Sequence, residues 1–383
     1  MRICYLANID NIHARRWVRF FAERGNDVYV LCDRIPESTI EGVTVIRPEM
    51  NLLTKIVAFK IVRSVHSNSF FKARAYRRCI RDIKPDIVHG IEALVYGFST
   101  AKSGSFPKVL TPWGNDIFVW PKRSSVARFL VTHALKGVDC ITTNMPNLAE
   151  SLEKEYNIPH DKVKAFSWGI DLETFRIGYE HEARELRNRL SISQKVPVIM
   201  SNRRIREFWG ISTITDSIMP VLDRRPDACF VFLAGAKPDN LLIRRIEEQV
   251  RDHGLEQHVR IIKDFLTPRE MAIYLNMADI FVSVPFSDLL SISILEGMAC
   301  GAVPVLSDLP AYSTRITHGK NGFLVPAGDS EKVAEIILHC LSHPELMQVI
   351  KKHNRTLVEE KDDQKKNMLK MEDIYTSLVK HKR

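Results

Sequence analysis

The chain has 383 residues, more than one hydrophobic core usually supports, so its length predicts two domains. Its 45% hydrophobic and 26% charged residues are typical of a globular protein and exclude disordered, collagen-like and disulfide-scaffold proteins. The formal net charge of +9 indicates an anionic partner only where the basic residues are concentrated in one segment.

The amino-terminal part alternates between strand-like runs and helix-length amphipathic segments. RICYLA is followed by ARRWVRFFAERG, and the alternation continues as far as Phe175. Such alternation predicts a parallel sheet covered by helices. The amino terminus reads as a strand and not as a secretion signal, and no apolar run approaches the roughly 18 residues of a membrane span. We therefore expect a cytoplasmic protein.

One segment within this part is strongly basic. Between Lys55 and Lys84 nine Lys and Arg residues stand among apolar residues, and Asp82 is the single acid. A solvated helix face, an anionic membrane surface and the phosphate backbone of a nucleic acid all fit such a segment. The sequence contains no groove-reading motif, so we expect no specific nucleic-acid partner.

The alternation weakens into a polar, charged stretch at residues 176–195 and then resumes with the strand-like run VPVIMS. We therefore expect a first α/β domain over residues 1–180 and a second over residues 181–365. Residues 366–383 carry an apolar stripe and are expected to form a terminal helix that packs back toward the first domain. Proteins with open parallel sheets of this kind bind their ligands beyond the carboxyl ends of the strands.

Several familiar cofactor and metal motifs are absent from the sequence. No GxGxxG follows the first strand, and no GxxxxGK[ST] or HExxH occurs. The seven cysteines are scattered and never spaced as CxxC, so we expect buried free thiols and neither disulfides nor zinc. We expect no metal and no cofactor.

The segment 283–308 carries the clearest chemical pattern. An apolar strand leads through a loop with Asp288 into a helix that contains Glu296. Free N–H groups at the start of that helix, together with its dipole, suit a diphosphate, and the two carboxylates suit the hydroxyls of a sugar and a ribose. A capping Asp followed by a surface Glu fits the same spacing. The residues expected to offer these N–H groups are Ser291, Ile292 and Ser293.

This segment resembles the E-x7-E signature of the family 4 retaining glycosyltransferases of the GT-B fold. It reads Asp288-x7-Glu296 and continues as EGMACGAVPVLSD. The stretches TTNMPNLAESLEKEYNI, FSWGIDLETF and HGKNGFLVPAGD are similar to further motifs of this family, in the same order. The resemblance implies two Rossmann-like doubly wound domains, the first for the acceptor and the second for the donor.

The resemblance also implies an activity. A hexose-type sugar would pass with retention, without a metal, from a nucleoside diphosphate sugar to an acceptor hydroxyl during polysaccharide or glycolipid assembly. A UDP-sugar is the favoured donor, and the acceptor would be a saccharide or a lipid-linked molecule. Because many such acceptors are carried on anionic lipid, we expect residues 55–84 to dock on the inner face of the plasma membrane.

On the donor side the resemblance assigns roles residue by residue. Glu296 would hold the ribose hydroxyls, Asp288 the hydroxyls of the sugar, and the N–H groups near Ile292 the diphosphate. The loop around Phe265 would touch the base.

The family's GR-x4-K pattern is only partly present. Arg204 stands at the Arg position and would neutralise the departing diphosphate, whereas Trp209 stands at the Lys position. We expect Arg203 or Arg206 to supply the second positive charge.

The first domain departs from the family pattern at the loop after its first strand. The usual glycine pair is absent, and Asn8, Asp10 and His13 stand there instead. These residues would meet the donor phosphate or the acceptor, although a His at this place also fits a helix cap or a packing residue.

The second departure concerns the active-site His of this family, which would align with Trp113. Asp116 is then the nearest polar group, and it would orient the sugar, assist deprotonation of the acceptor or cap a helix. His89, at the end of a strand, is either an acceptor contact or a satisfied core histidine. Since Trp113 and Trp209 replace polar residues, a GT-B partner subunit without transferase activity is the alternative function.

Overall fold

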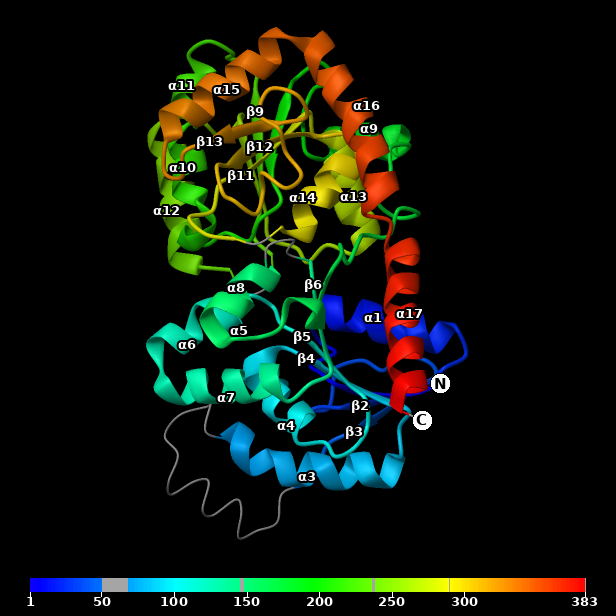
Figure 1. Ribbon diagram of the computed structural model, residues 1–383. Coiled ribbons are helices and arrows are strands. Elements are labelled where there is room, and N and C mark those ends of the chain that lie inside the picture. Colours follow the sequence, from blue (N-terminus) through cyan, green and yellow to red (C-terminus); the bar gives the residue numbers. More distant parts are fainter. Residues whose placement is uncertain (50–67, 145–147, 236–237, 289, 383) are drawn as a thin grey trace. The chain divides into compact units, whose positions relative to one another are not determined.

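The computed structural model describes residues 1–49, 68–144, 148–235, 238–288 and 290–382 (Figure 1). The chain divides into two compact units. The amino-terminal unit comprises Met1–Trp168 and Lys366–Arg383, and the carboxyl-terminal unit comprises Gly169–Lys365. Each unit is an α/β structure around one parallel sheet, so the predicted fold class is confirmed.

The sheet of the amino-terminal unit has the strand order β3-β2-β1-β4-β5-β6-β7, and all of its pairings are parallel. The chain reverses its direction across the sheet between β1 and β4, and ligands of open α/β sheets bind at such a switch point. The strands are β1 (Arg2–Leu6), β2 (Asp27–Leu31), β3 (Val43–Ile46), β4 (Ile87–Ile91), β5 (Lys108–Thr111), β6 (Cys140–Thr143) and β7 (Val163–Ala165).

Helices cover both faces of this sheet. Alternate residues of β1 point to opposite faces: Cys4 and Leu6 share a core cluster with Tyr76 of α3, whereas Tyr5 contacts Phe21 of α1. The helical elements described in this unit are α1 (Ile12–Glu23), α3 (Asn68–Ile83), η2 (Ala93–Gly97), α4 (Phe98–Ala101), α5 (Asn115–Phe118), α6 (Trp120–Arg123), α7 (Ser125–Lys136), α8 (Leu148–Tyr156) and η3 (His160–Lys162), together with most of α17 (Gln364–Lys382).

The terminal helix α17 is held to the amino-terminal unit by a buried tyrosine. The Tyr375 hydroxyl donates to the Tyr5 hydroxyl at 3.1 Å and lies 2.5 Å from Nδ1 of His89. The ring of Tyr375 also contacts Phe21 of α1. On the surface, Arg24 pairs with Glu372 of α17 at 2.7 Å. Residues 366–382 therefore pack as part of this unit.

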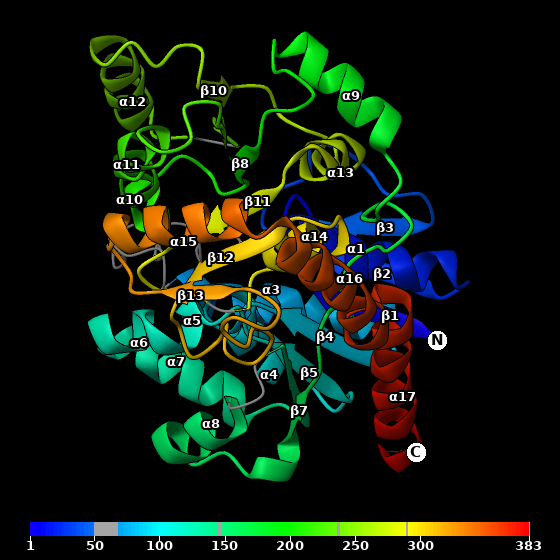
Figure 2. The same ribbon diagram turned by 90° about the horizontal axis from the view of Figure 1, so that it is seen from above.

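The sheet of the carboxyl-terminal unit has the order β10-β9-β8-β11-β12-β13, again with parallel pairings, and its switch point lies between β8 and β11. Its strands are β8 (Val198–Ser201), β9 (Cys229–Leu233), β10 (Val259–Ile262), β11 (Ile280–Ser283), β12 (Val303–Ser307) and β13 (Phe323–Val325). One core cluster joins the sheet to α10, α11, α12 and α15, and a second joins it to α9, α13, α14 and α16 (Figure 2).

The helical elements described in the carboxyl-terminal unit range from three residues in η4 to 18 residues in α16. They are α9 (Glu180–Arg189), η4 (Glu207–Trp209), α10 (Ile211–Asp216), α11 (Ile218–Leu222), α12 (Asn240–Asp252), α13 (Pro268–Met277), α14 (Ile292–Ala299), α15 (Ser330–Ser342) and α16 (Pro344–Lys361).

The division between the units falls after Trp168, before the expected boundary at residue 180. Phe175 and Tyr179 belong to the core of the carboxyl-terminal unit, and Ile170 donates its N–H to the carbonyl of Asp362 at 2.8 Å. The stretch 176–195, at which the domain boundary is expected, contains helix α9. Only Ala183 and Leu186 of that helix are buried, so its apolar face is too narrow to stand out in the sequence.

Candidate functional site

Two loops meet at the carboxyl edge of the sheet in the carboxyl-terminal unit. The loop after β8 holds residues 202–209, and the loop after β11 leads into α14. Since β8 and β11 are neighbours at the switch point, the loops are adjacent, and Nδ2 of Asn202 donates to the carbonyl of Ser293 at 2.9 Å.

Arg203, in the loop after β8, contacts both the loop after β11 and the start of α14. Its guanidinium donates to Asp288 at 2.8 Å, to the Ser291 hydroxyl at 2.5 Å and to the Ser293 hydroxyl at 2.9 Å. The same guanidinium carbon lies 3.8 Å from the ring centroid of Trp209, which is a cation–π contact. Arg203 is only 7% exposed, so a permanent positive charge is fixed beside the start of α14.

Asp288 has a second partner that the sequence analysis did not identify. The Tyr312 hydroxyl donates to Asp288 at 2.8 Å. Burial and the Asp288 charge raise the pKa of Tyr312, so its hydroxyl stays protonated as a donor. Tyr312 follows the loop after β12, and only its place near a strand's carboxyl end could have indicated it.

Arg204 and Arg206 are exposed at the same edge. The stem of Arg204 lies against Gly235, which follows β9 with a positive φ of 69°; a Cβ at Gly235 would come within 2.7 Å of the Arg204 side chain. Gly210, with the same φ, lies so close to the Val284 carbonyl that a side chain would collide with it. Neither glycine was identified from the sequence.

Helix α14 presents its amino end to these residues. The Ser291 side chain contacts Arg203 and the Ser293 hydroxyl, and it makes no capping bond. The first N–H groups of a helix have no i−4 acceptor within it, and in α14 that of Ile294 donates to the Ser291 carbonyl at 3.1 Å, which leaves those of Ile292 and Ser293 to face an anion. Glu296 is partly buried further along α14, and Phe265, just beyond β10, is 76% exposed.

The carboxylate of Asp116, in the amino-terminal unit, accepts hydrogen bonds from backbone N–H groups. The residue is 3% exposed, and its carboxylate accepts N–H groups from Ala93 at 2.6 Å, Trp113 at 2.9 Å and Gly114 at 2.7 Å. Burial raises its pKa, and the three N–H donors oppose that rise. Of the roles expected for Asp116, this geometry supports capping, because the carboxylate fixes the turn after β5.

His89 is a satisfied core histidine. It is fully buried, its Nε2 lies 2.7 Å from the Thr111 hydroxyl, and its Nδ1 contacts the Tyr375 hydroxyl. Burial lowers its pKa to about 3, so the imidazole is neutral. The expected contact with an acceptor is therefore wrong, since no atom of His89 reaches the surface.

The residues that follow β1 contact other residues of the amino-terminal unit. Asn8 accepts the N–H of Asp10 at 3.1 Å, and Asp10 accepts the N–H of Glu37 at 3.1 Å. The His13 ring lies 5.4 Å from the ring of Trp113 and 6.4 Å from that of Trp168, and Trp17 contacts Trp168 at 6.0 Å. His13, Trp17, Trp113 and Trp168, named the aromatic cluster below, lie at the carboxyl edge of this sheet.

Glu92 is a residue at this edge that the sequence analysis missed. It follows β4 at the switch point and has a positive φ of 81°, which is rare for a residue with a side chain. Burial, followed by the charges of Asp116 and Asp33, raises its pKa to about 7. Its place directly after a buried strand was the only signal in the sequence.

Two properties of the described residues bear on cofactors and membranes. Within those residues, no three His, Cys, Asp or Glu side chains gather as a metal ion would require. No helix in the described part of the chain is both long and apolar enough to cross a bilayer.

Family models match both units of the chain. Residues 2–145 match a model described as glycosyl transferase 4-like, and residues 196–343 match one described as glycosyl transferases group 1. Each match lies inside one unit. Fold and matches together define the class, a two-unit α/β protein of the GT-B fold. Each unit is thus similar to one family of glycosyltransferase domains.

Curated relatives have low identity to the chain. A D-inositol 3-phosphate glycosyltransferase of Jonesia denitrificans is 23% identical over 55% of this chain and 50% of its own length. An alpha-monoglucosyldiacylglycerol synthase of Streptococcus pneumoniae is 24% identical over 58% of this chain and 49% of its own length. The chain thus spans about half the length of these relatives.

Solved structures show the same fold over the whole chain. Sucrose-phosphate synthase of Thermosynechococcus elongatus superimposes with a TM-score of 0.80, at 18% identity, over 100% of this chain and 96% of its own. HepE of Anabaena, solved with UDP and glucose, gives a TM-score of 0.79 at 15% identity over 98% of this chain and 100% of its own.

Proposed function

We propose that this chain is a retaining glycosyltransferase that moves a hexose-type sugar from a nucleoside diphosphate donor, with UDP favoured, to an acceptor hydroxyl. The observation that carries this proposal is the fixed guanidinium of Arg203 beside the free N–H groups of α14. The charge of Arg203 is balanced by Asp288, so the N–H groups of α14 and the exposed Arg204 and Arg206 at the same edge would supply the donors and the net positive charge for a diphosphate. HepE, a structural neighbour, was solved with UDP-glucose, which fits this choice of donor.

Arg203 would compensate for the Lys that Trp209 replaces. Its guanidinium stacks on the Trp209 ring and reaches the hydroxyls at the start of α14, so the positive charge is retained although the Lys is absent. Arg204, exposed at the same edge, would contact the phosphate that carries the leaving charge. Such preorganised donors lower the barrier most where negative charge develops as the bond to the sugar breaks.

The two carboxylates of the signature would have different tasks. Asp288 is paired with Arg203 and hydrogen-bonded by Tyr312, so it would orient the guanidinium as well as bind a sugar hydroxyl. Glu296, inside α14, would bind the ribose hydroxyls. Neither role requires a metal ion, because the arginines and the helix terminus supply the positive charge.

The acceptor would bind at the carboxyl edge of the amino-terminal sheet. Within the aromatic cluster, Trp17 and Trp168 are buried, and the partly exposed rings of His13 and Trp113 would offer faces of the kind on which sugars pack. Glu92 would offer a carboxyl group at the switch point. Asp116 would act as a positioning residue for the Trp113 turn.

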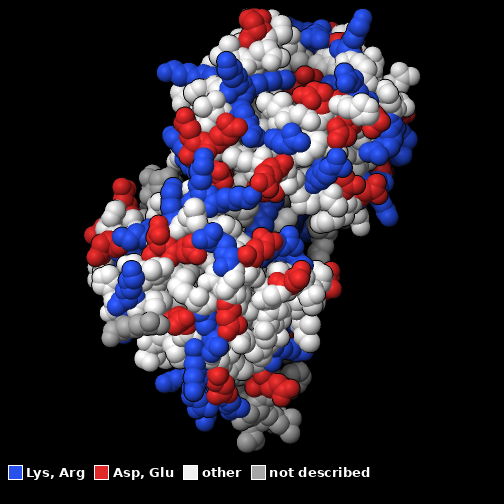
Figure 3. All heavy atoms as spheres, turned by 90° about the vertical axis from the view of Figure 1, so that its right-hand side faces the viewer, with Lys and Arg blue, Asp and Glu red and all other residues white. Residues whose placement is uncertain are grey.

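Peripheral docking on anionic lipid would bring a lipid-linked acceptor to the enzyme. Residues 55–67 of the basic segment lie outside the described residues, but α3 exposes a row of bases against one acid, Asp82. On the face drawn in Figure 3, by contrast, Lys and Arg side chains are interspersed with Asp and Glu side chains. The exposed bases at α3 are Arg74, Arg77, Arg78, Arg81 and Lys84.

The proposal is tested by incubating the purified chain with UDP-, GDP- and ADP-hexoses and following release of the nucleoside diphosphate. We expect turnover with UDP-hexose, and a product whose anomeric configuration equals that of the donor by proton NMR. Arg204→Ala should lower the rate by about 100-fold, whereas Arg244→Ala on exposed α12 should not. If no donor is turned over with any acceptor tested, the alternative function, a GT-B partner subunit without transferase activity, would be supported instead.

A further inference from the structure

The carboxyl-terminal unit has a hollow away from the donor edge. It is a cavity of about 590 Å³ between α9 and α16, and its floor is formed by residues 276–279 and by the turn at residues 300–301. Asp279 immediately precedes β11, so the cavity opens at the amino edge of the sheet. The donor loops follow β8 and β11 at the opposite edge, and this hollow has no part in the proposed transfer.

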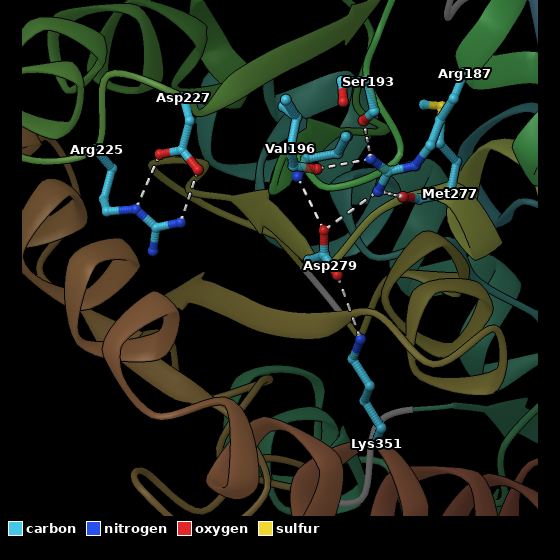
Figure 4. Close-up of polar contacts among 9 residues, drawn as sticks. Arg187, Ser193, Val196, Arg225, Asp227, Met277, Asp279 and Lys351 are labelled. Carbon is cyan, nitrogen blue, oxygen red and sulfur yellow. Dashed lines mark hydrogen bonds and ion pairs between the residues drawn. The ribbon is translucent and has the colours of Figure 1, made fainter.

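Arg187 and Asp279 build one wall of this hollow (Figure 4). Arg187 donates to the carbonyls of Val196 at 2.6 Å and Met277 at 2.9 Å and pairs with Asp279 at 3.4 Å. Asp279 also accepts the N–H of Val198 at 2.9 Å. The hydrogen-bonding capacity of this pair is therefore used within the protein, and its charges cancel.

Arg355 builds the other wall in the same way. It donates to the carbonyls of Phe175 at 2.9 Å and Ala299 at 3.2 Å and pairs with Glu359 at 2.6 Å. Both walls are thus held by arginines that bind backbone carbonyls, which gives the hollow a fixed shape.

Three further cations line the hollow, and one of them, Lys351, forms a long ion pair with Asp279. Nζ of Lys351 lies 3.8 Å from Asp279, beyond hydrogen-bond length, and its side chain is only 18% exposed. Arg184 on α9 and Lys352 on α16 are exposed, and within the residues that the structure describes neither has an ion-pair partner. Glu180 is the one remaining acid of the lining.

We infer that this hollow binds a small phosphorylated metabolite, with its phosphate on Lys351 between Arg184 and Lys352. Lysine and arginine side chains at a recessed position suit a phosphate dianion, because they supply several charged donors to its oxygens. The volume exceeds what inorganic phosphate needs and lies in the range of pockets that hold a sugar phosphate or a nucleotide. This inference does not depend on the identity of the donor or the acceptor.

The test is isothermal titration of the full chain with glucose 6-phosphate, pyrophosphate and inorganic phosphate. We expect glucose 6-phosphate, the phosphate ester among these probes, to bind the wild type, and Arg184→Glu and Lys352→Glu each to weaken its binding about tenfold or more. Both residues are exposed, so these variants should fold, and Lys351→Met provides the same test from inside the cavity. Arg244→Glu on α12 is the matched charge reversal away from the hollow.

Arg204→Ala separates this site from the donor site, since it should leave binding of the phosphate ester unchanged. Three results would overturn the inference. The first is that no probe binds at about 10 mM. The second is that the Arg184→Glu and Lys352→Glu variants bind the probe with the same affinity as the wild type. The third is that the Arg204→Ala variant no longer binds it.

Discussion

At the residue scale, Arg203 joins three segments of the candidate donor site: the loop after β8, the loop with Asp288 and the start of α14. Removing it would leave the Asp288 carboxylate without its ion pair and the diphosphate without a fixed charge. We expect Arg203→Ala to weaken UDP binding by at least about tenfold, since a hydrogen bond to a charged group contributes about 1.5–3 kcal/mol.

A second substitution tests whether Arg203 acts in place of the absent Lys. Trp209→Lys, introduced into the Arg203→Ala chain, should recover part of the lost affinity for UDP because it returns a cation to this edge. Calorimetric titration of the single and double variants measures the recovery. Further weakening in the double variant would show that Trp209 contributes by its ring alone.

Glu92 gives a prediction about pH. Its folded-state pKa of about 7 lies above the ordinary value of 4.5, so the folded chain holds this proton more tightly than the unfolded chain does. The stability that Glu92 contributes is present below about pH 4.5 and is lost as the pH rises to about 7, by at most about 3 kcal/mol. The facing acids are Asp116 and Asp33, and Asp33 is itself paired with Lys72.

Glu92→Gln removes the ionisation, so the variant should be as stable as the wild type near pH 4.5 and more stable above pH 7. Urea denaturation across this range gives the comparison, with Glu153→Gln on exposed α8 as the control. A constant difference between wild type and Glu92→Gln at every pH would contradict the assignment.

At the scale of elements, the position of α14 depends on Gly297. A Cβ at this residue would come within 2.6 Å of the Phe281 ring on β11, so only glycine lets the helix lie this close to the strand. We expect Gly297→Ala to destabilise the chain by about 1–3 kcal/mol through overpacking, despite the better helix propensity of alanine. Phe281→Leu in the same chain should restore most of this loss, as measured by urea denaturation. Equal stability of Gly297→Ala and wild type would contradict the close packing.

The sequence predicts the regular elements better than the irregular ones. The strand-like runs RICYLA and VPVIMS contain β1 and β8, because their apolar residues are buried on both faces of a parallel sheet. Helix α9 is not predicted by the sequence, because its charged residues outnumber its two buried ones and hide the helical pattern. The turn that places Glu92 has no recognisable pattern, since it depends on contacts of Asp116 with Ala93.

The donor site shows the same limit. The place of α14 and the residue types around it could be inferred from one continuous segment, 283–308. The stacking of Arg203 on Trp209 and the bond from Tyr312 to Asp288 join separate segments of the chain. Spacing along a sequence carries no information about such contacts, so they required the structure.

At the scale of the whole molecule, the net charge of +9 gives a prediction about membranes. We expect the chain to float with vesicles that contain anionic lipid and to be released by salt, since each base near such a surface contributes about 1 kcal/mol and is screened. The paired reversal Arg77→Glu and Arg78→Glu on α3 should reduce flotation strongly. The matched reversal Arg244→Glu and Arg245→Glu on α12 should not, and equal loss in both would refute docking through α3.

The central claim is that the diphosphate of an activated sugar binds at the amino end of α14. A crystal structure of the chain with UDP-glucose tests it most directly. We predict phosphate oxygens within hydrogen-bond distance of the N–H groups of Ile292 and Ser293 and of the Arg203 guanidinium. Density for the nucleotide at any other place, including the hollow between α9 and α16, with the start of α14 left empty, would contradict the claim.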